Sequence, residues 1–152
     1  MVSPVRTHAM ADIFHHFIVK APPRKVFDAV SQSAGLDTWW TKRSAGEAQE
    51  GAEYTLWFGP EFDWRARVSC CIPHSEFELN ITKAHHDWLN TRVGFLLEPH
   101  NGATDVHFYH LGWPETNDHY RISNYCWAMY LRLLKRYVEL GETVPYEQRL
   151  EV

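Results

Sequence analysis

Cysteine is scarce in this 152-residue sequence, and the positions of its three cysteines argue against a disulfide framework. Cys70 and Cys71 are adjacent, and Cys126 leaves an odd number, whereas a disulfide-stabilised domain carries an even set of spaced cysteines. The chain also has no signal-like N-terminus and no apolar run of about 18 residues, the length that a membrane helix needs. We therefore expect a cytoplasmic protein with no membrane partner.

An excess of positive charge is also lacking. The formal net charge is −4, the isoelectric point is near 6.2, and no block of basic residues occurs. Nucleic acids and anionic membranes are bound by basic patches. The sequence therefore predicts neither of them as a partner.

The motifs of common enzyme and metal sites are absent as well. There is no Cys-x-x-Cys, His-Glu-x-x-His, nucleophile elbow, phosphate loop or dinucleotide fingerprint. Ten histidines are present, but the pairs 15–16 and 85–86 are adjacent, and a strand would point adjacent side chains to opposite faces. Because a zinc site needs three or four converging donors, we expect no metal, no cofactor and no catalytic residue. This favours a binding protein over an enzyme.

Aromatic residues, by contrast, are abundant. Seven Trp, seven Tyr and eight Phe make up 14% of the chain. A buried aromatic side chain removes roughly 150–250 Å² from water, so a domain of this length closes its core with fewer. Two interpretations remain open: the aromatics form a bulky core, or some of them line a cavity.

Hydrophobic periodicity predicts one α+β domain at residues 12–152, after a flexible lead-in at residues 1–11. Alternation of apolar and polar residues predicts six strands, at residues 12–20, 52–58, 63–71, 75–83, 91–98 and 103–111. Two short helical segments, 24–30 and 36–40, precede the second strand, and residues 41–50 are expected to form a polar loop. Because the later strands follow one another through tight turns, the sheet is predicted to be antiparallel.

Alternation also assigns side chains to the faces of this sheet. Cys70 is expected to share the apolar face of its strand with Val68. In the next strand, Glu76 and Glu78 are expected to face water.

The longest predicted element is a helix at residues 118–140. Trp127, Leu131 and Leu134 recur at helical spacing and form one apolar stripe. Asp118 is expected to cap the first turn, and Gly141 is placed to end the helix. The apolar arc is wide, so the helix needs a broad, concave partner, which the curved sheet can supply.

Five short motifs in the same order resemble the START-like (SRPBCC) superfamily, and specifically its branch of activators of the heat-shock protein 90 ATPase. Residues 21–29 (APPRKVFDA) resemble the helix entry APxxVWxA, and residues 35–40 resemble the LxxWW element. Residues 51–54 match GxxF with Tyr for Phe, and residues 102–110 resemble GxTxVxxxH. Residues 127–141 follow WxxxLxxLKxxLExG.

The resemblance implies a helix-grip fold, in which a curved antiparallel sheet surrounds the C-terminal helix and an apolar cavity. Relatives in the superfamily bind lipids, sterols, polyketides and plant hormones. Two positions depart from the pattern. Cys126 stands where the family has glycine before the helix tryptophan, and Cys70 replaces a common acidic residue.

The inward strand faces and the inward helix stripe together predict the lining of a ligand cavity. The predicted lining residues are Tyr54, Leu56, Val68, Phe95, Phe108, His110, Trp127, Tyr130, Leu131 and Leu134. His110 would orient the ligand by a hydrogen bond; alternatively, backbone or water satisfies it. The predicted mouth residues are Trp39, Trp40, Trp113 and Tyr120. Alternation leaves Trp57, Trp64 and Trp88 open as further lining residues.

Three functions follow from these expectations, in decreasing order of support. The first is a binding module for a small apolar or aromatic molecule. The second is a co-chaperone-like interaction domain, which is disfavoured because the eukaryotic activators carry an additional N-terminal domain. The third is a cyclase- or hydrolase-like enzyme that uses the same cavity. A homodimer is also expected, through an exposed aromatic patch near Trp39 or Trp113.

Overall fold

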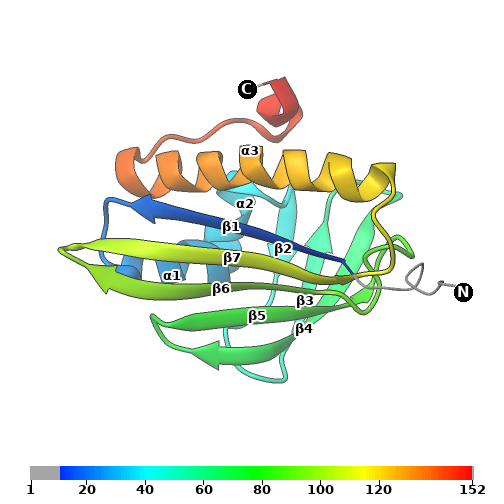
Figure 1. Cartoon of the computed structure of the whole chain (residues 1–152), viewed down its shortest axis with the longest axis horizontal. Coiled ribbons are helices and arrows are strands. Elements are labelled where there is room, and N and C mark those ends of the chain that lie inside the picture. The colour runs from blue at the N-terminus through cyan, green and yellow to red at the C-terminus, as the bar shows by residue number, and fades with distance from the viewer. Residues whose placement is uncertain (1–10, 152) are drawn as a thin grey trace, which may run out of the picture.

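The computed structural model describes residues 11–151, as three α-helices, seven strands and one 3₁₀ segment (Figure 1). The order along the chain is β1 (Ala11–Val19), α1 (Pro23–Ser31), α2 (Ser33–Trp39), β2 (Arg43–Ala45), β3 (Glu53–Trp57), β4 (Asp63–Ile72), β5 (Glu76–Lys83), β6 (Arg92–His100), β7 (Ala103–Trp113), α3 (Asp118–Leu140) and η2 (Tyr146–Glu151). The predicted lead-in lies outside the described residues except for Ala11, which begins β1.

All strands join one antiparallel sheet in the order β1-β7-β6-β5-β4-β3-β2. The sheet curves, and α1 and α2 lie behind it in the view of Figure 1, with α3 running along the side of β1. This α+β arrangement of a curved sheet and a C-terminal helix agrees with the helix-grip expectation.

The sheet has seven strands, so the prediction of six is wrong. The additional strand, β2, lies in the predicted polar loop and pairs with β3 from Arg43↔Trp57 to Ala45↔Thr55. Three residues are too few to show an alternating pattern. Tertiary contacts hold this strand instead: the Arg43 guanidinium stacks 4.2 Å from the Trp57 ring centroid, and Ser44 Oγ donates to Asp37 Oδ1 at 2.8 Å.

Two predicted side-chain directions are also corrected. The register shifts between Val68 and Cys70, and such a bulge reverses the alternation after it. Cys71, rather than Cys70, consequently packs against the core. Glu78 does not face water freely: it is only 9% exposed, and it accepts hydrogen bonds from Ser69 Oγ and Tyr109 OH, each at 2.6 Å.

Helix α3 has the predicted bounds, with one change at its start. Asn117 is the N-cap, and its side chain accepts a hydrogen bond from the Tyr120 amide at 2.9 Å; Asp118, predicted to be the cap, is the first helical residue. At the other end, Gly141 has φ 68° and its amide donates to Tyr137 O at 2.8 Å. This left-handed conformation is why glycine stands there.

The side chains of α3 cover the outer edge of β1. Lys135 Nζ donates to Ile18 O at 2.6 Å, and Glu139 Oε2 accepts from the Lys20 amide at 2.6 Å. At the other end of the helix, Tyr120 OH donates to Asp12 O at 2.7 Å. Backbone groups of an edge strand are otherwise available to another chain, so the helix both packs on the sheet and protects its edge.

The core lies between the sheet, α1, α2 and the inward stripe of α3. Trp127 is 2% exposed, and its ring centroid lies 4.5 Å from that of Phe108 on β7. Trp39 and Trp113 are both fully buried, so the expectation of an exposed patch at either one is wrong. Trp39 is held inside because its indole N–H donates to Ala29 O at 2.9 Å.

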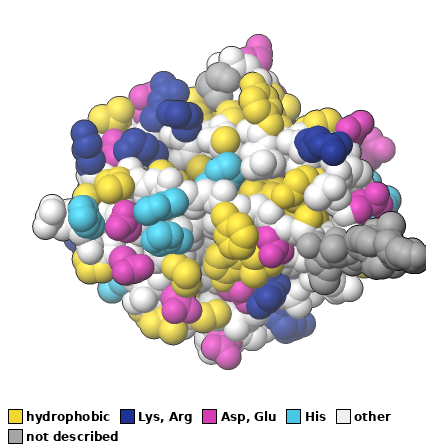
Figure 2. Space-filling model, viewed as in Figure 1, with side chains coloured by type: hydrophobic (Ala, Val, Ile, Leu, Met, Phe, Trp, Pro, Cys, Tyr) yellow, Lys and Arg dark blue, Asp and Glu magenta, His cyan; other side chains and the backbone are white. Residues whose placement is uncertain are grey.

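The outer face of the sheet is turned toward the viewer in Figure 2, where hydrophobic side chains gather over its middle among charged and histidine side chains. Phe14 (67% exposed), Ile18 and Leu96 are the exposed large hydrophobic residues on its strands β1 and β6. Among residues 11–151, no helix is long and apolar enough to cross a membrane.

Candidate functional site

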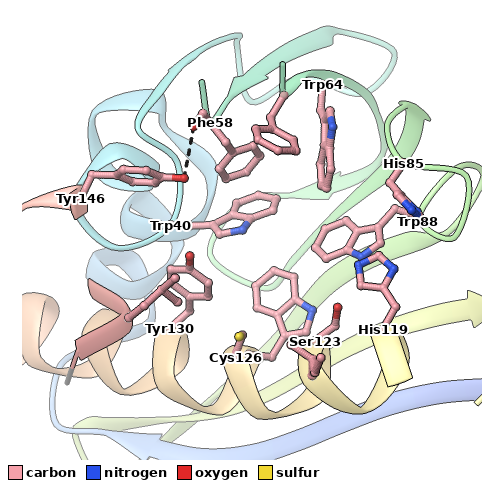
Figure 3. A pocket seen from close by; sticks show the side chains of 14 residues that line it. Trp40, Phe58, Trp64, His85, Trp88, His119, Ser123, Cys126, Tyr130 and Tyr146 are labelled. Atoms are coloured by element: carbon pink, nitrogen blue, oxygen red, sulfur yellow. Dashed lines mark hydrogen bonds between the residues drawn. The ribbon is translucent and has the colours of Figure 1, made fainter. Parts of the chain in front are cut away.

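A pocket of about 430 Å³ opens at the end of the sheet beside the first half of α3. It is lined by Trp40, Phe58, Phe62, Trp64, His85, Trp88, His119, Ile122, Ser123, Cys126, Trp127, Tyr130, Tyr146 and Leu150. Figure 3 shows that the labelled side chains come from α3 and from several other parts of the chain and point toward a common space. Eight of the fourteen are Phe, Tyr or Trp, so the lining is mainly apolar.

Five of these rings form a closed aromatic cluster: Trp40, Phe58, Trp64, Trp88 and Trp127. The centroid of each ring lies 5.0–5.8 Å from that of the next. Most of the pairs are tilted or edge-to-face, which is the arrangement that aromatic quadrupoles favour. The cluster therefore gives the pocket a lining that is in place without a ligand.

The C-terminal segment supplies one wall of the pocket, through Tyr146 and Leu150 of η2. Arg149, between them, is only 4% exposed and donates to Thr41 O at 3.1 Å and to Asp37 O at 2.7 Å. Burial lowers the pKa of this guanidinium. Tyr146 OH donates to Phe58 O at 3.3 Å, drawn as the dashed line in Figure 3. Arg149 thus fixes η2 on α2 and on the chain that follows it.

Few polar side chains line the pocket, and the indole donor of one lining residue is buried and unused. The indole N–H of Trp88, a residue 7% exposed, has no hydrogen-bond partner among residues 11–151. Such a donor costs roughly 1–3 kcal/mol when it is left unsatisfied. Cys126 supplies a thiol, and burial raises its pKa. Burial also raises the pKa of Tyr130 to about 12, so both groups are neutral at pH 7.

The predicted cavity residues divide into two groups. Trp127 and Tyr130 line the pocket. The others are packed in the core between the sheet and the helices: Tyr54, Leu56, Val68, Phe95, Phe108, His110, Leu131 and Leu134. Tyr54 illustrates this packing, since its hydroxyl donates to Ser31 O at 2.5 Å.

His110 lies behind the pocket lining rather than in it. Trp127 Nε1 donates to His110 Nδ1 at 3.1 Å, and His110 Nε2 lies 2.8 Å from Thr91 Oγ1. Because Nδ1 accepts, the proton is assigned to Nε2, which donates to Thr91. Burial lowers the pKa of His110 to about 3. Both ring nitrogens are thus committed to joining β7 to α3 and to the β5–β6 connection.

Of the predicted mouth residues, Trp40 lines the pocket. Trp39 lies beneath it, with ring centroids 6.0 Å apart. Trp113 packs against Tyr120 at 5.5 Å, and Tyr120 holds β1 through its hydroxyl. Trp64 and Trp88, which alternation left open, also line the pocket.

Several lining residues were outside the predicted set, and most of them lie outside the predicted strands and helices. Phe62, His85, Tyr146 and Leu150 belong to connections or to the C-terminal segment, where no periodicity reports which way a side chain points. Ser123 and Cys126 are on α3. Ser123 is four residues before Trp127 and lies on its stripe, and Cys126 is four residues before Tyr130, so helical spacing is the signal that identifies them.

A sequence model of the family described as "Activator of Hsp90 ATPase homolog 1-like protein" matches residues 20–139. The chain belongs to this family. The match covers α1 through almost all of α3 and includes most of the pocket lining.

Three solved structures have the same fold as this chain. The Aha1 dimer from Colwellia psychrerythraea is 30% identical, with a TM-score of 0.79 over 88% of this chain and 99% of that one. The protein MLL2253 from Mesorhizobium loti is 17% identical, with a TM-score of 0.74 over 87% and 99% of the two chains. CalU16 from Micromonospora echinospora is 16% identical, with a TM-score of 0.69 over 97% and 88%. A comparison with curated proteins gave no significant match.

Proposed function

We propose that this protein binds a small apolar or aromatic molecule in the pocket beside the first half of α3. The observation that carries the proposal is the closed aromatic cluster that lines a space of about 430 Å³. Pockets for small ligands are typically about 300–1,000 Å³ and mostly apolar, with a few polar groups. The size and the lining both fit this class.

The energy of binding would come from burial of apolar surface. Each 100 Å² of apolar ligand surface removed from water contributes about 2.5 kcal/mol. Aromatic ligands have the additional advantage of stacking on the rings of the aromatic cluster.

A pocket-filling variant tests this proposal. Cys126→Trp adds an indole to the pocket without deleting any ring of the lining. We expect wild-type protein to bind anilinonaphthalene sulfonate with a saturable rise in fluorescence, and Cys126→Trp to bind it at least about ten-fold more weakly, the effect of roughly 1.4 kcal/mol.

Tyr125→Trp is the matched control, because Tyr125 is the preceding residue on α3 and is 80% exposed. It should bind the dye as wild type does. Equal affinity in wild type and Cys126→Trp, or no saturable binding by wild type, would remove the support for a ligand in this pocket. If the dye results support the pocket, native mass spectrometry of gently purified protein identifies any natural ligand by its mass.

A second candidate function rests on the family description, which refers to activation of the Hsp90 ATPase. In this case the protein would act on a chaperone rather than on a small molecule. An ATPase assay with the chaperone of the same organism decides between the two. Stimulation that persists in Cys126→Trp would favour the chaperone role.

We also propose that the chain forms a homodimer in the cytoplasm. Support for the dimer comes from the Colwellia psychrerythraea relative, which was solved as a dimer. Support for the compartment comes from Cys70, Cys71 and Cys126, which are all free thiols. Sedimentation velocity should give twice the 17.8 kDa mass of one chain; a single species at the monomer mass would contradict the dimer.

A further inference from the structure

Three potential metal ligands lie together in the connection between β5 and β6. They are His85, His86 and Asp87, and one donor atom from each lies within 4.8 Å of the others. Sequence alternation placed the two histidines on opposite faces, but they lie in a turn, not in a strand. Their rings are stacked with centroids 4.2 Å apart. Adjacent side chains alternate between faces only in a strand, so this alternation does not separate His85 from His86.

The distances between the donors are close to those of a metal site. His86 Nε2 lies 3.3 Å from Asp87 Oδ1, and His85 Nδ1 lies 3.9 Å from Asp87 Oδ2. Zinc binds imidazole nitrogen and carboxylate oxygen at about 2.0–2.2 Å in a tetrahedron, which separates the ligand atoms by about 3.3–3.5 Å. One pair is already at this separation. The side chains of His85 and His86 are 45% and 82% exposed, so they are free to rotate inward.

The carboxylate is held as a metal-binding carboxylate usually is. The Asp87 side chain is 5% exposed; its Oδ2 lies 2.9 Å from His119 Nδ1 and accepts from Asn117 Nδ2 at 3.2 Å. Asn117 is the N-cap of α3, and His119 is in its first turn. Hydrogen bonds of this kind orient ligating carboxylates. Both hydrogen bonds are made by Oδ2. The other carboxylate oxygen, Oδ1, lies 3.3 Å from His86 Nε2 and is available to a metal ion.

The His85 ring has the tautomer that coordination through Nδ1 requires. Its Nδ1 accepts a hydrogen bond from the Asp87 amide at 3.1 Å, so this nitrogen carries a lone pair rather than a proton. A metal ion would bind this same lone pair, so coordination replaces the hydrogen bond from the Asp87 amide. Figure 3 shows His85 and His119 beside Trp88 at one end of the pocket, so one of the three donors, His85, also lines the pocket.

We propose that His85, His86 and Asp87 bind one divalent transition metal ion, and zinc fits two imidazoles and a carboxylate in a tetrahedral site. His119 is a positioning residue that orients Asp87. Three protein ligands leave a coordination position open, and solvent or an oxygen atom of a molecule at the pocket opening would fill it. The proposal does not depend on the apolar ligand, because the donors are complete without one.

Calorimetric titration of metal-free, chelator-treated protein with zinc ions tests the site. We expect one saturable site per chain in wild type. His86→Gln should weaken it by roughly ten-fold or more, since outer-shell substitutions alone typically cost 10–100-fold. The 82% exposure of this side chain makes the substitution safe for folding. Cobalt should give the visible absorption of a low-coordinate site in wild type and lose it in His86→Gln.

His16→Gln is the matched control. His16 is also exposed, lies 3.1 Å from a carboxylate oxygen of Asp105 and stacks on His107 with centroids 4.1 Å apart, but it is on the outer face of the sheet. Its loss should leave the zinc affinity unchanged. The proposal is overturned if wild type shows no saturable zinc binding, if His86→Gln binds as wild type does, or if His16→Gln weakens binding equally.

Discussion

At the scale of single residues, His110 has the clearest structural role, because its hydrogen bonds position parts of the pocket lining. It is fully buried and neutral, and its two nitrogens connect Trp127 on α3 with Thr91 in the β5–β6 connection. Thr91 Oγ1 in turn donates to the Trp88 carbonyl. Through this chain of hydrogen bonds, one histidine fixes the position of two tryptophans of the aromatic cluster.

We predict that the stability of the protein falls with acidity because of His110. The unfolded residue has a pKa near 6.5, whereas burial lowers the folded pKa to about 3. The folded state is therefore favoured most above pH 6.5, and this stabilisation is lost as the pH falls from 6.5 toward 3. In that range His110 is protonated in the unfolded chain but stays neutral in the folded protein. The slope from this group is about 1.4 kcal/mol per pH unit.

Urea unfolding of wild type and His110→Gln between pH 4.5 and 7.5 measures this contribution. The variant is expected to be less stable at pH 7.5, where it loses the histidine's hydrogen bonds, and to approach wild type as the pH falls. A difference in free energy of unfolding that is constant across this range would show that His110 does not titrate as its burial requires.

At the scale of elements, Glu139 connects the end of α3 to β1. Its carboxylate accepts from the Lys20 amide at 2.6 Å and from Lys135 Nζ at 2.7 Å. Burial acts to raise the pKa of Glu139, but these hydrogen bonds outweigh it and the pKa is lowered. The stabilisation is therefore present at neutral pH and is lost as the pH falls below about 4.5.

We predict that Glu139→Gln lowers the free energy of unfolding by about 1–2 kcal/mol at pH 7, because a charged acceptor in two hydrogen bonds is replaced by a neutral one. Glu142→Gln is the control. Glu142 pairs with Arg136, and both side chains are more than a third exposed, so its loss should change stability by less than about 0.5 kcal/mol. Equal effects in the two variants would refute the assigned role of Glu139.

The elements also show what a sequence can and cannot predict. The bounds of helix α3 are predictable to the residue, because a wide apolar stripe and a terminal glycine are local signals, whereas its N-cap is Asn117 rather than the predicted Asp118. The strand β2 is not, because three residues owe their conformation to Trp57 and Asp37. The face of Cys70 is likewise set by a bulge, which depends on the partner strand and leaves no mark in the alternation.

At the scale of the whole molecule, the pocket is built at the end of the sheet where connections meet α3. Trp127 and Tyr130 were predictable lining residues because helical periodicity gives their direction. Periodicity identifies which residues face inward, but it does not separate a filled core from a hollow one. Phe95 and Phe108 face inward and pack edge-to-face at 5.3 Å, whereas Trp64 and Trp88 face inward and border a space.

The most direct test of the central proposal, a ligand in the pocket beside α3, is a nitrogen–proton correlation spectrum of the tryptophan indoles during titration with anilinonaphthalene sulfonate. Trp88 and Trp64 line the pocket, so their indole signals should shift and saturate together. The indoles of Trp39, bonded to Ala29 O, and of Trp57, stacked on Arg43, should not move. Shifts confined to Trp57, or no shifts at saturating dye, would contradict the proposal.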